Sequence, residues 1–242
     1  MELREVYQAT VSSNTKYPMT KVKSIVGDII DPIRSFPAKT IIFNFEDKQI
    51  CYPFAAIYMN KTNKPIRSLA VFCGSKTGKN PIFIQHAEKL GELLAENNIT
   101  LIYGGGNVGI MGIIADKVMK HGGEVIGIIP KLLLEWERQH EKISELIVVD
   151  DMHIRKKLIY EKCDAALILP GGFGTLDELF EMLTWNQLSI HDKQIFILNS
   201  GGFYDHLILH IEQMKAEHFL YEIAEQRVTV IHDPSELSVY LK

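Results

Sequence analysis

Between residue 67 and the C-terminus, short apolar runs alternate with segments whose apolar residues recur every three or four positions. The runs predict buried strands and the repeats predict amphipathic helices. The expected strands are 68–73, 100–103, 124–129, 146–149, 165–169, 194–198 and 228–231, and the expected helices are 81–97, 109–121, 153–163, 175–190, 203–217 and 234–241. Strands that alternate with helices predict an α/β fold, a Rossmann-like doubly wound parallel sheet with helices on both faces.

Residues 1–66 do not follow this alternation and form a predicted N-terminal extension whose role the sequence leaves open. The polar segment 60–65 predicts a boundary, so 67–242 is the expected Rossmann-like domain. Within the extension the pattern predicts one short helix and two strands, at 24–31, 40–46 and 49–58.

Composition and charge exclude several classes of protein. The chain has 26 Lys and Arg against 30 Asp and Glu, a net charge of −4, and no long basic run. Neither a nucleic-acid polymer nor an anionic membrane is therefore an expected partner. No apolar run reaches about 18 residues, and the N-terminus does not resemble a signal peptide. Cys51, Cys73 and Cys163 are odd in number and lack metal-type spacing, which favours the cytoplasm.

Two glycine-rich loops are predicted at strand ends, where parallel α/β sheets bind ligands. The first, 104–109, matches G-x-G-x-x-G and would let backbone N–H groups approach an anion. A dinucleotide site also needs an acidic residue about 20 positions later, at the end of the next strand, whereas Glu124 begins that strand. We favour another phosphate-bearing ligand over a dinucleotide or a ligand-free turn. The second loop, 170–175, would hold the same phosphorylated ligand from another side.

The loop 74–80 resembles a Walker P-loop but fails its spacing. Three residues separate its glycines where four are needed, and Asn80 stands where Ser or Thr is required. Ser75 follows a predicted strand end, so it either faces the site or belongs to an ordinary polar loop.

Glu178 has two competing interpretations. With Thr175 it matches a capping box, with Thr at the N-cap and Glu at the third helical position. From this spacing alone, capping is favoured over catalysis. The basic triplet 155–157 is also ambiguous, because such a run is usually a solvated helix face. It opens a helix that follows a strand end, however, so Arg155 is placed to hold a phosphate or a base.

No metal and no organic cofactor is predicted. The nine histidines are scattered, and His206 and His210 share a helix face without the Glu of an H-E-x-x-H motif. The sequence also lacks the G-x-S-x-G element of a serine hydrolase.

Taken jointly, the motifs resemble the LOG ("lonely guy") family. Its P-G-G-x-G-T-x-x-E hallmark is matched by 170–178, and its M-H-x-R-K hallmark by 152–156. Further similar stretches are 71–75, 103–106, 109–112 and 184–191, so the resemblance covers residues 67–220 and leaves the N-terminal extension outside. Many relatives carry the label "lysine decarboxylase", but no lysine arrangement typical of a pyridoxal-phosphate enzyme is recognisable.

The resemblance implies a Rossmann-like homodimer that hydrolyses the N-glycosidic bond of a nucleoside 5′-monophosphate, either AMP or a cytokinin riboside monophosphate. It implies catalytic roles for Arg155 and Glu178. The expected substrate-binding residues are Ser75, Gly104, Gly105, Gly106, Gly109, Met111, Met152, Lys156, Gly171, Gly172, Gly174 and Thr175. The alternative is a non-catalytic carrier of a phosphorylated nucleotide-like cofactor such as molybdenum cofactor.

Overall fold

The computed structural model describes residues 40–45, 48–53, 65–134, 138–220 and 228–241. Contacts within the chain divide it into two units, Met1–Asn63 and Lys64–Lys242. In the first unit, strands β1 (Thr40–Phe45) and β2 (Lys48–Pro53) pair antiparallel, with Thr40 opposite Pro53. The helix expected at 24–31 lies outside the described residues.

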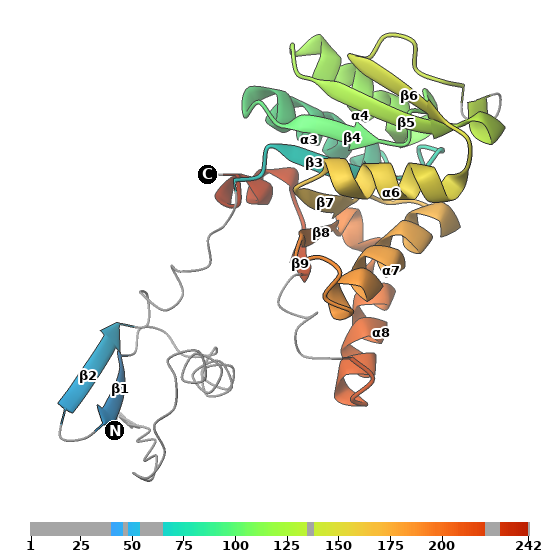
Figure 1. The fold of residues 1–242 in the computed structure, drawn as a ribbon. Helices are drawn as coiled ribbons and strands as arrows, with labels where there is room; N and C mark the ends of the chain where they lie inside the picture. Colours follow the sequence, from blue (N-terminus) through green and yellow to red (C-terminus); the bar gives the residue numbers. More distant parts are fainter. Residues whose placement is uncertain (1–39, 46–47, 54–64, 135–137, 221–227, 242) are drawn as a thin grey trace. The chain divides into compact units, whose positions relative to one another are not determined.

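The second unit is built on a seven-stranded parallel sheet with the strand order β6-β5-β4-β3-β7-β8-β9 (Figure 1). Its strands are β3 (Ser68–Phe72), β4 (Thr100–Tyr103), β5 (Val125–Pro130), β6 (Glu145–Val149), β7 (Ala165–Ile168), β8 (Gln194–Leu198) and β9 (Val228–Ile231). Its helices are α3 (Ile82–Glu96), α4 (Gly109–Lys120), α6 (Met152–Lys162), α7 (Phe173–Gln187) and α8 (Asp205–Ala216). Three 3₁₀ turns, η2 (Lys131–Leu133), η3 (Ser200–Gly202) and η4 (Pro234–Val239), complete the described elements. The predicted α/β fold is confirmed.

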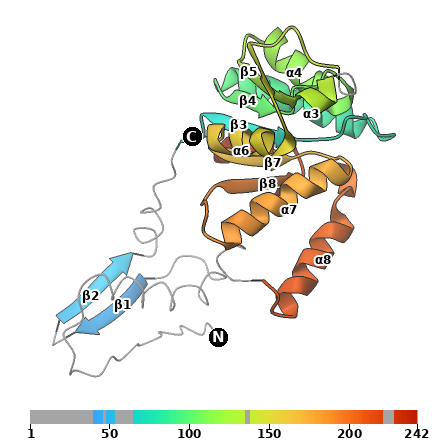
Figure 2. The same ribbon diagram turned by 45° about the vertical axis from the view of Figure 1, so that its right-hand side comes forward.

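Apolar side chains pack on both faces of this sheet, as the continuous apolar runs predict. Along β3, Leu69 and Val71 join one core cluster, while Ala70 and Phe72 join the other. The first cluster includes the buried faces of α3 and α4, and the second includes residues of α6, α7 and α8. Figures 1 and 2 show these two groups of helices on opposite sides of the sheet.

The strand order reverses between β3 and β7, which are neighbours although a long stretch of sequence separates them. From β3 the chain builds outward through β4, β5 and β6, and it then returns to place β7 on the other side of β3. The loops after β3 and β7 diverge at this switch point, and Gly74 N donates to Pro170 O at 3.0 Å to join them. In open α/β sheets such a crevice at the carboxyl ends of the strands is the place where ligands bind.

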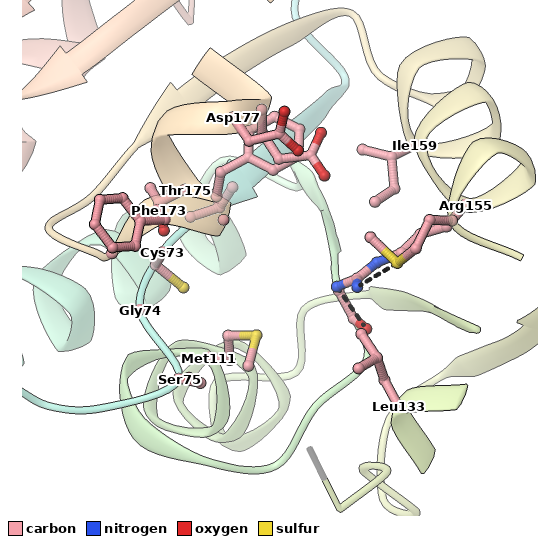
Figure 3. A pocket seen from close by; sticks show the side chains of 17 residues that line it. Cys73, Gly74, Ser75, Met111, Leu133, Arg155, Ile159, Phe173, Thr175 and Asp177 are labelled. Atoms are coloured by element: carbon pink, nitrogen blue, oxygen red, sulfur yellow. Dashed lines mark hydrogen bonds between the residues drawn. The ribbon is translucent and has the colours of Figure 1, made fainter. Parts of the chain in front are cut away.

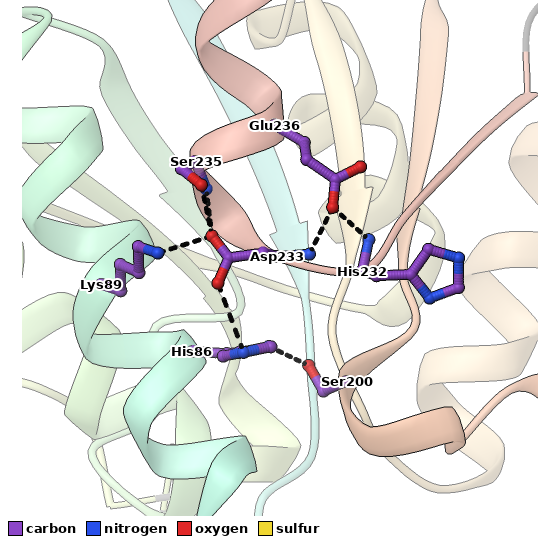
Figure 4. A network of polar contacts seen from close by, with 7 residues as sticks. All are labelled: His86, Lys89, Ser200, His232, Asp233, Ser235 and Glu236. Carbon is purple, nitrogen blue, oxygen red and sulfur yellow. Dashed lines mark hydrogen bonds and ion pairs between the residues drawn. The ribbon is translucent and has the colours of Figure 1, made fainter.

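The C-terminal segment is attached to α3 by a polar network (Figure 4). Asp233 caps η4 in a capping box with Glu236, and its carboxylate lies 2.5 Å from Lys89 Nζ and 3.8 Å from His86 Nε2. The other ring nitrogen of His86 forms a hydrogen bond with Ser200 Oγ at 2.8 Å. The helix predicted at 234–241 is therefore a capped 3₁₀ turn that closes one face of the sheet.

Candidate active site

A cavity of about 330 Å³ opens at the carboxyl ends of β3 and β7 (Figure 3). The loop after β3, helix α4, turn η2 and the first turns of α6 and α7 supply its walls. Among the residues predicted to form the site, those that line this cavity are Ser75, Gly104, Met111, Met152, Arg155, Gly172, Gly174, Thr175 and Glu178. Residues from five separate parts of the sequence therefore converge at the switch point of the sheet.

Arg155 enters the cavity from the first turn of α6. The N-cap of this helix is Asp151, whose carboxylate accepts a hydrogen bond from Ile154 N at 2.9 Å. The Arg155 side chain is buried, and its Nη2 donates to Gly104 O at 3.3 Å while Nη1 lies 3.8 Å from Met152 Sδ. Figure 3 shows Arg155 across the cavity from Thr175. A buried guanidinium that faces an open cavity is suited to bind an anion or a polar base.

Glu178 lines the same cavity from α7 and is partly buried. Burial raises the pKa of its carboxyl group to about 7, although the positive charges of Lys156 and Arg155 oppose the rise. The neighbouring carboxylates of Glu181 and Asp177 raise the pKa further. A carboxyl group with a pKa near neutrality can exchange a proton at physiological pH, which is the property that acid–base catalysis requires.

The capping box predicted for Thr175 and Glu178 is wrong. Helix α7 begins at Phe173, two residues earlier than the pattern indicated, and its N-cap is Gly172 without a side-chain hydrogen bond. Thr175 is therefore the third helical residue, and Glu178 lies in the second turn, beyond reach of the N-cap N–H. Gly172 has an extended backbone, and a glycine can serve as N-cap without a capping side chain. The Glu178 carboxylate is therefore not used as a cap, and it lines the cavity.

The N-terminus of α7 presents an open backbone. A Cβ added to Gly172 or Gly174 would meet nothing within 4 Å, so the side of the loop that a side chain would occupy is empty space. At Gly171, by contrast, a Cβ would lie 2.0 Å from Thr175 Oγ1, and this glycine lines a neighbouring cavity of about 350 Å³ together with Ser75. An accessible helix N-terminus carries a partial positive charge and free N–H groups, which suit a phosphate.

The other three glycines of the first loop pack against neighbouring backbone and do not line the cavity. His140 N donates to Gly105 O at 3.0 Å, and Gly106 forms an isolated bridge with Gln139. Gly109 has φ +57°, and a Cβ there would lie 2.3 Å from the carbonyl carbon of Ser75. These three glycines do not line the cavity, but they allow the close backbone packing that places Gly104 and Ser75 on its wall.

Lys156 also lies outside the cavity lining. Its Nζ lies 2.8 Å from Asp177 Oδ2 and 3.2 Å from Glu181 Oε2, so it forms ion pairs between α6 and α7. The family resemblance groups Lys156 with the substrate-binding residues, and no motif in the sequence singles out either acidic partner. Nothing in the spacing of the two helices indicated that these side chains would meet, because the pairing depends on how the helices pack.

Other lining residues were also missed. They are Val71, Phe72, Cys73, Gly74, Leu133, Ile159, Phe173 and Asp177. Cys73 and Gly74 could have been found because they directly precede Ser75 at the end of β3, and Phe173 because it stands between two predicted loop glycines. Phe173 is 93% exposed at the cavity mouth (Figure 3), which is unusual for a large apolar side chain. No feature of the sequence indicated that Leu133 and Ile159 would line the cavity.

Within the described ranges, no cluster of three or more His, Cys, Asp or Glu side chains could hold a metal ion. In the same ranges, no helix combines the length and the apolar character that crossing a bilayer requires.

Comparison with known proteins identifies the family. A family model described as "Possible lysine decarboxylase" matches residues 111–241. A cytokinin riboside 5′-monophosphate phosphoribohydrolase of Arabidopsis thaliana is 41% identical over 179 residues, which are 74% of this chain and 82% of that protein. The chain belongs to the LOG family. A probable enzyme of the same name from Oryza sativa subsp. japonica is 43% identical over 171 residues, 71% of this chain and 70% of that protein.

Two solved structures of other proteins share the fold. A molybdenum cofactor binding protein from Rippkaea orientalis aligns with a TM-score of 0.54 at 22% identity, over 71% of this chain and 93% of that one. A Moco carrier protein from Chlamydomonas reinhardtii aligns with a TM-score of 0.54 at 17% identity, over 72% of this chain and 96% of that one. At these identities the similarity supports the Rossmann-like architecture alone.

Proposed function

We propose that this protein hydrolyses the N-glycosidic bond of a nucleoside 5′-monophosphate, releasing the free base and ribose 5-phosphate. The observation that carries the proposal is a single cavity in which the buried Arg155 guanidinium and the Glu178 carboxyl, with its pKa of about 7, lie beside the open N-terminus of α7. Relatives that are about 40% identical and named cytokinin riboside 5′-monophosphate phosphoribohydrolases support this activity and favour a cytokinin riboside monophosphate as substrate. AMP is the other substrate that the sequence resemblance implies.

The phosphate binds at the glycine loop of α7 in this proposal. Backbone N–H groups of 172–174 and the hydroxyl groups of Thr175 and Ser75 surround it, and the helix dipole stabilises its negative charge. Gly104, Met111 and Met152 enclose the rest of the nucleotide. Gly105, Gly106, Gly109 and Gly171 contribute by holding the two loops at the required distance, since each packs closely against neighbouring groups.

The bond to the base breaks through a ribose that resembles an oxocarbenium ion, as in glycoside hydrolysis. The ionised Glu178 carboxylate stabilises this positive charge and accepts a proton from the water that adds to C1′. Arg155 holds the phosphate or polarises the departing base. The base leaves with the bonding electron pair and takes a proton from solvent, and Glu178 later returns the proton of the added water to solvent, so that the net reaction consumes one water. Each step uses side chains that already line the cavity.

The test is incubation of the full chain with a panel of nucleoside 5′-monophosphates, with free base measured by chromatography. The matching nucleosides serve as a control without phosphate. We expect base release from at least one monophosphate, and at least about 100-fold slower release from its nucleoside, because the phosphate contacts position the substrate. Equal cleavage of the nucleoside would contradict the phosphate site. Tight binding of a monophosphate without any base release would favour a carrier instead.

We further propose that the protein is a homodimer. Helices α7 and α8 and the segments after them expose large apolar side chains, with exposed fractions of 63% at Leu188, 59% at Leu209 and 76% at Phe219. Exposed apolar surface of this kind marks protein interfaces. Light scattering coupled to size-exclusion chromatography should give twice the mass of one chain, and Leu209→Lys should shift the protein toward the monomer. A wild-type chain that elutes as a monomer at micromolar concentration would contradict the dimer.

The proposed location is the cytoplasm. Cys163 is a buried thiol that takes part in no disulfide, as expected of a protein in a reducing compartment. Fractionation of cells that produce the untagged chain should recover the protein with cytoplasmic markers, and recovery with secreted or membrane fractions would contradict this location.

A further inference from the structure

Arg155 and Lys156 are consecutive residues of α6, but their side chains have different surroundings. The Arg155 side chain lines the cavity, whereas that of Lys156 does not and is instead directed at α7, where its Nζ contacts Asp177 Oδ2 at 2.8 Å and Glu181 Oε2 at 3.2 Å. The Lys156 side chain is only 16% exposed, so solvent screens these contacts less than ordinary surface pairs. Its two partners flank Glu178, one residue before it and three residues after it.

Three carboxyl groups therefore lie within five residues of α7, and one of them is the partly buried Glu178 of the cavity. The charged groups that act on Glu178 are Arg155 and Lys156 from α6 and Asp177 and Glu181 from its own helix. Without a nearby cation, the two flanking carboxylates would repel a charge on Glu178 and favour its protonated form. Lys156 offsets both carboxylates and also attracts the Glu178 charge directly.

We propose that Lys156 is a positioning residue for the reaction: its ammonium, held between Asp177 and Glu181, keeps the Glu178 carboxylate ionised in the cavity that Arg155 also lines. The kinetic consequences of this inference rest on the proposed function. The role differs from direct binding of the substrate phosphate, because the Lys156 ammonium has carboxylate partners and lies outside the cavity lining.

The first experiment compares Lys156→Met with Lys157→Met. Lys157 is the matched control because it is the next residue, is 71% exposed and lies 3.8 Å from Glu161, one turn along the same helix. We expect Lys156→Met to raise the midpoint of the acid limb of kcat by about one pH unit and to lower kcat at pH 6 about tenfold. KM should change little, Lys157→Met should behave as the wild type, and Lys156→Arg should restore the wild-type profile.

A second variant, Glu181→Gln, distinguishes an electrostatic role of Lys156 from a purely structural role in packing α6 against α7. It breaks one of the same ion pairs but removes a negative charge instead of a positive one. We therefore expect the midpoint of the acid limb to move to lower pH, opposite to Lys156→Met. Equal losses of kcat at every pH in both variants would show that Lys156 only stabilises the packing of α6 against α7. A tenfold rise in KM of Lys156→Met with an unchanged midpoint would show that it binds substrate. Either result overturns the proposal.

A third measurement does not depend on turnover. Carbon-13 NMR of the chain labelled at glutamate side chains follows the ionisation of Glu178, whose signal is assigned by its absence in Glu178→Gln. The titration midpoint should be higher in Lys156→Met than in the wild type. If the wild type releases no base and this shift is still observed, the proposed function fails while the inference holds. If the wild type is active and the two midpoints coincide, the inference alone is overturned.

Discussion

Gly104 and Arg155 are placed so that any side chain on the first would displace the second. A Cβ on Gly104 would lie 2.1 Å from Arg155 Nη2, well inside van der Waals contact. The same Nη2 donates to Gly104 O at 3.3 Å, so the glycine both leaves room for the guanidinium and holds it. Gly104 lies in the loop after β4, whereas Arg155 lies near the start of α6.

Gly104→Ala should therefore act on catalysis through Arg155. We expect kcat/KM for base release to fall about 100-fold, because a displacement of about 1 Å at a reacting group has an effect of that size. The fold should be retained, since the atom that must move is the end of a flexible side chain. The measurement is base release beside thermal unfolding, and the control is the double variant with Arg155→Ala. A double variant much less active than Arg155→Ala would contradict this mechanism.

The pH dependence of kcat should follow ionisation of Glu178. Because burial raises the pKa of this carboxyl to about 7 and the ionised form is the active one, kcat should rise with pH up to about 7 and then level off. At pH 5 kcat should be about 100-fold below the plateau. The profile should be read in kcat rather than kcat/KM, since the substrate phosphate itself titrates near pH 6. A kcat that is constant from pH 5.5 to 8, or that falls with rising pH, would be inconsistent with this role.

Glu178→Gln should abolish base release and stabilise the fold above neutral pH. The folded state raises the pKa of Glu178 to about 7, so it favours the protonated form. This favourable contribution is complete below pH 4.5 and is lost as pH rises through 7. The wild type should therefore lose about 2–3 kcal/mol of unfolding free energy over this range relative to Glu178→Gln. Melting temperatures at pH 4.5 and pH 8 measure the difference, with Glu161→Gln as an exposed control. The same difference at both pH values would contradict the shifted pKa.

Asp233→Ala should weaken the attachment of the C-terminal turn without affecting the reaction. The variant removes the cap of η4 and the ion pair with Lys89, which should cost about 1 kcal/mol or more and lower Tm by about 2–4 °C. The Lys89 ammonium and Ser235 hold the pKa of Asp233 below its usual range, so the stabilisation is present above the ordinary Asp pKa and is lost on acidification. Base release at 25 °C should be unchanged, and an unaltered Tm at pH 7 would contradict the role of the network.

The limits of the sequence predictions are clearest at the ends of elements. The strand at 194–198 and the glycine loops after β4 and β7 appear where they were predicted, because their apolar runs and glycines are local signals. Helix α7 begins at Phe173 instead of Thr175, because Gly172 serves as its N-cap and the chain does not use the Thr175–Glu178 pattern. Because of that difference of two residues, Glu178 does not take the capping role that its spacing alone favoured and lines the cavity, where the resemblance implies a catalytic role.

The sequence by itself determined the alternation of strands and helices and the position of the glycine loops at strand ends, because both depend on residues within a few positions of one another. Only the tertiary structure decided that β7 returns beside β3, and so brings Gly104, Arg155 and Glu178 to one cavity. It also decided the charges around Glu178, since Lys156 meets Asp177 and Glu181 only where α6 and α7 pack. The raised pKa of Glu178 follows from burial, which is a property of the packed molecule and not of any segment of its sequence.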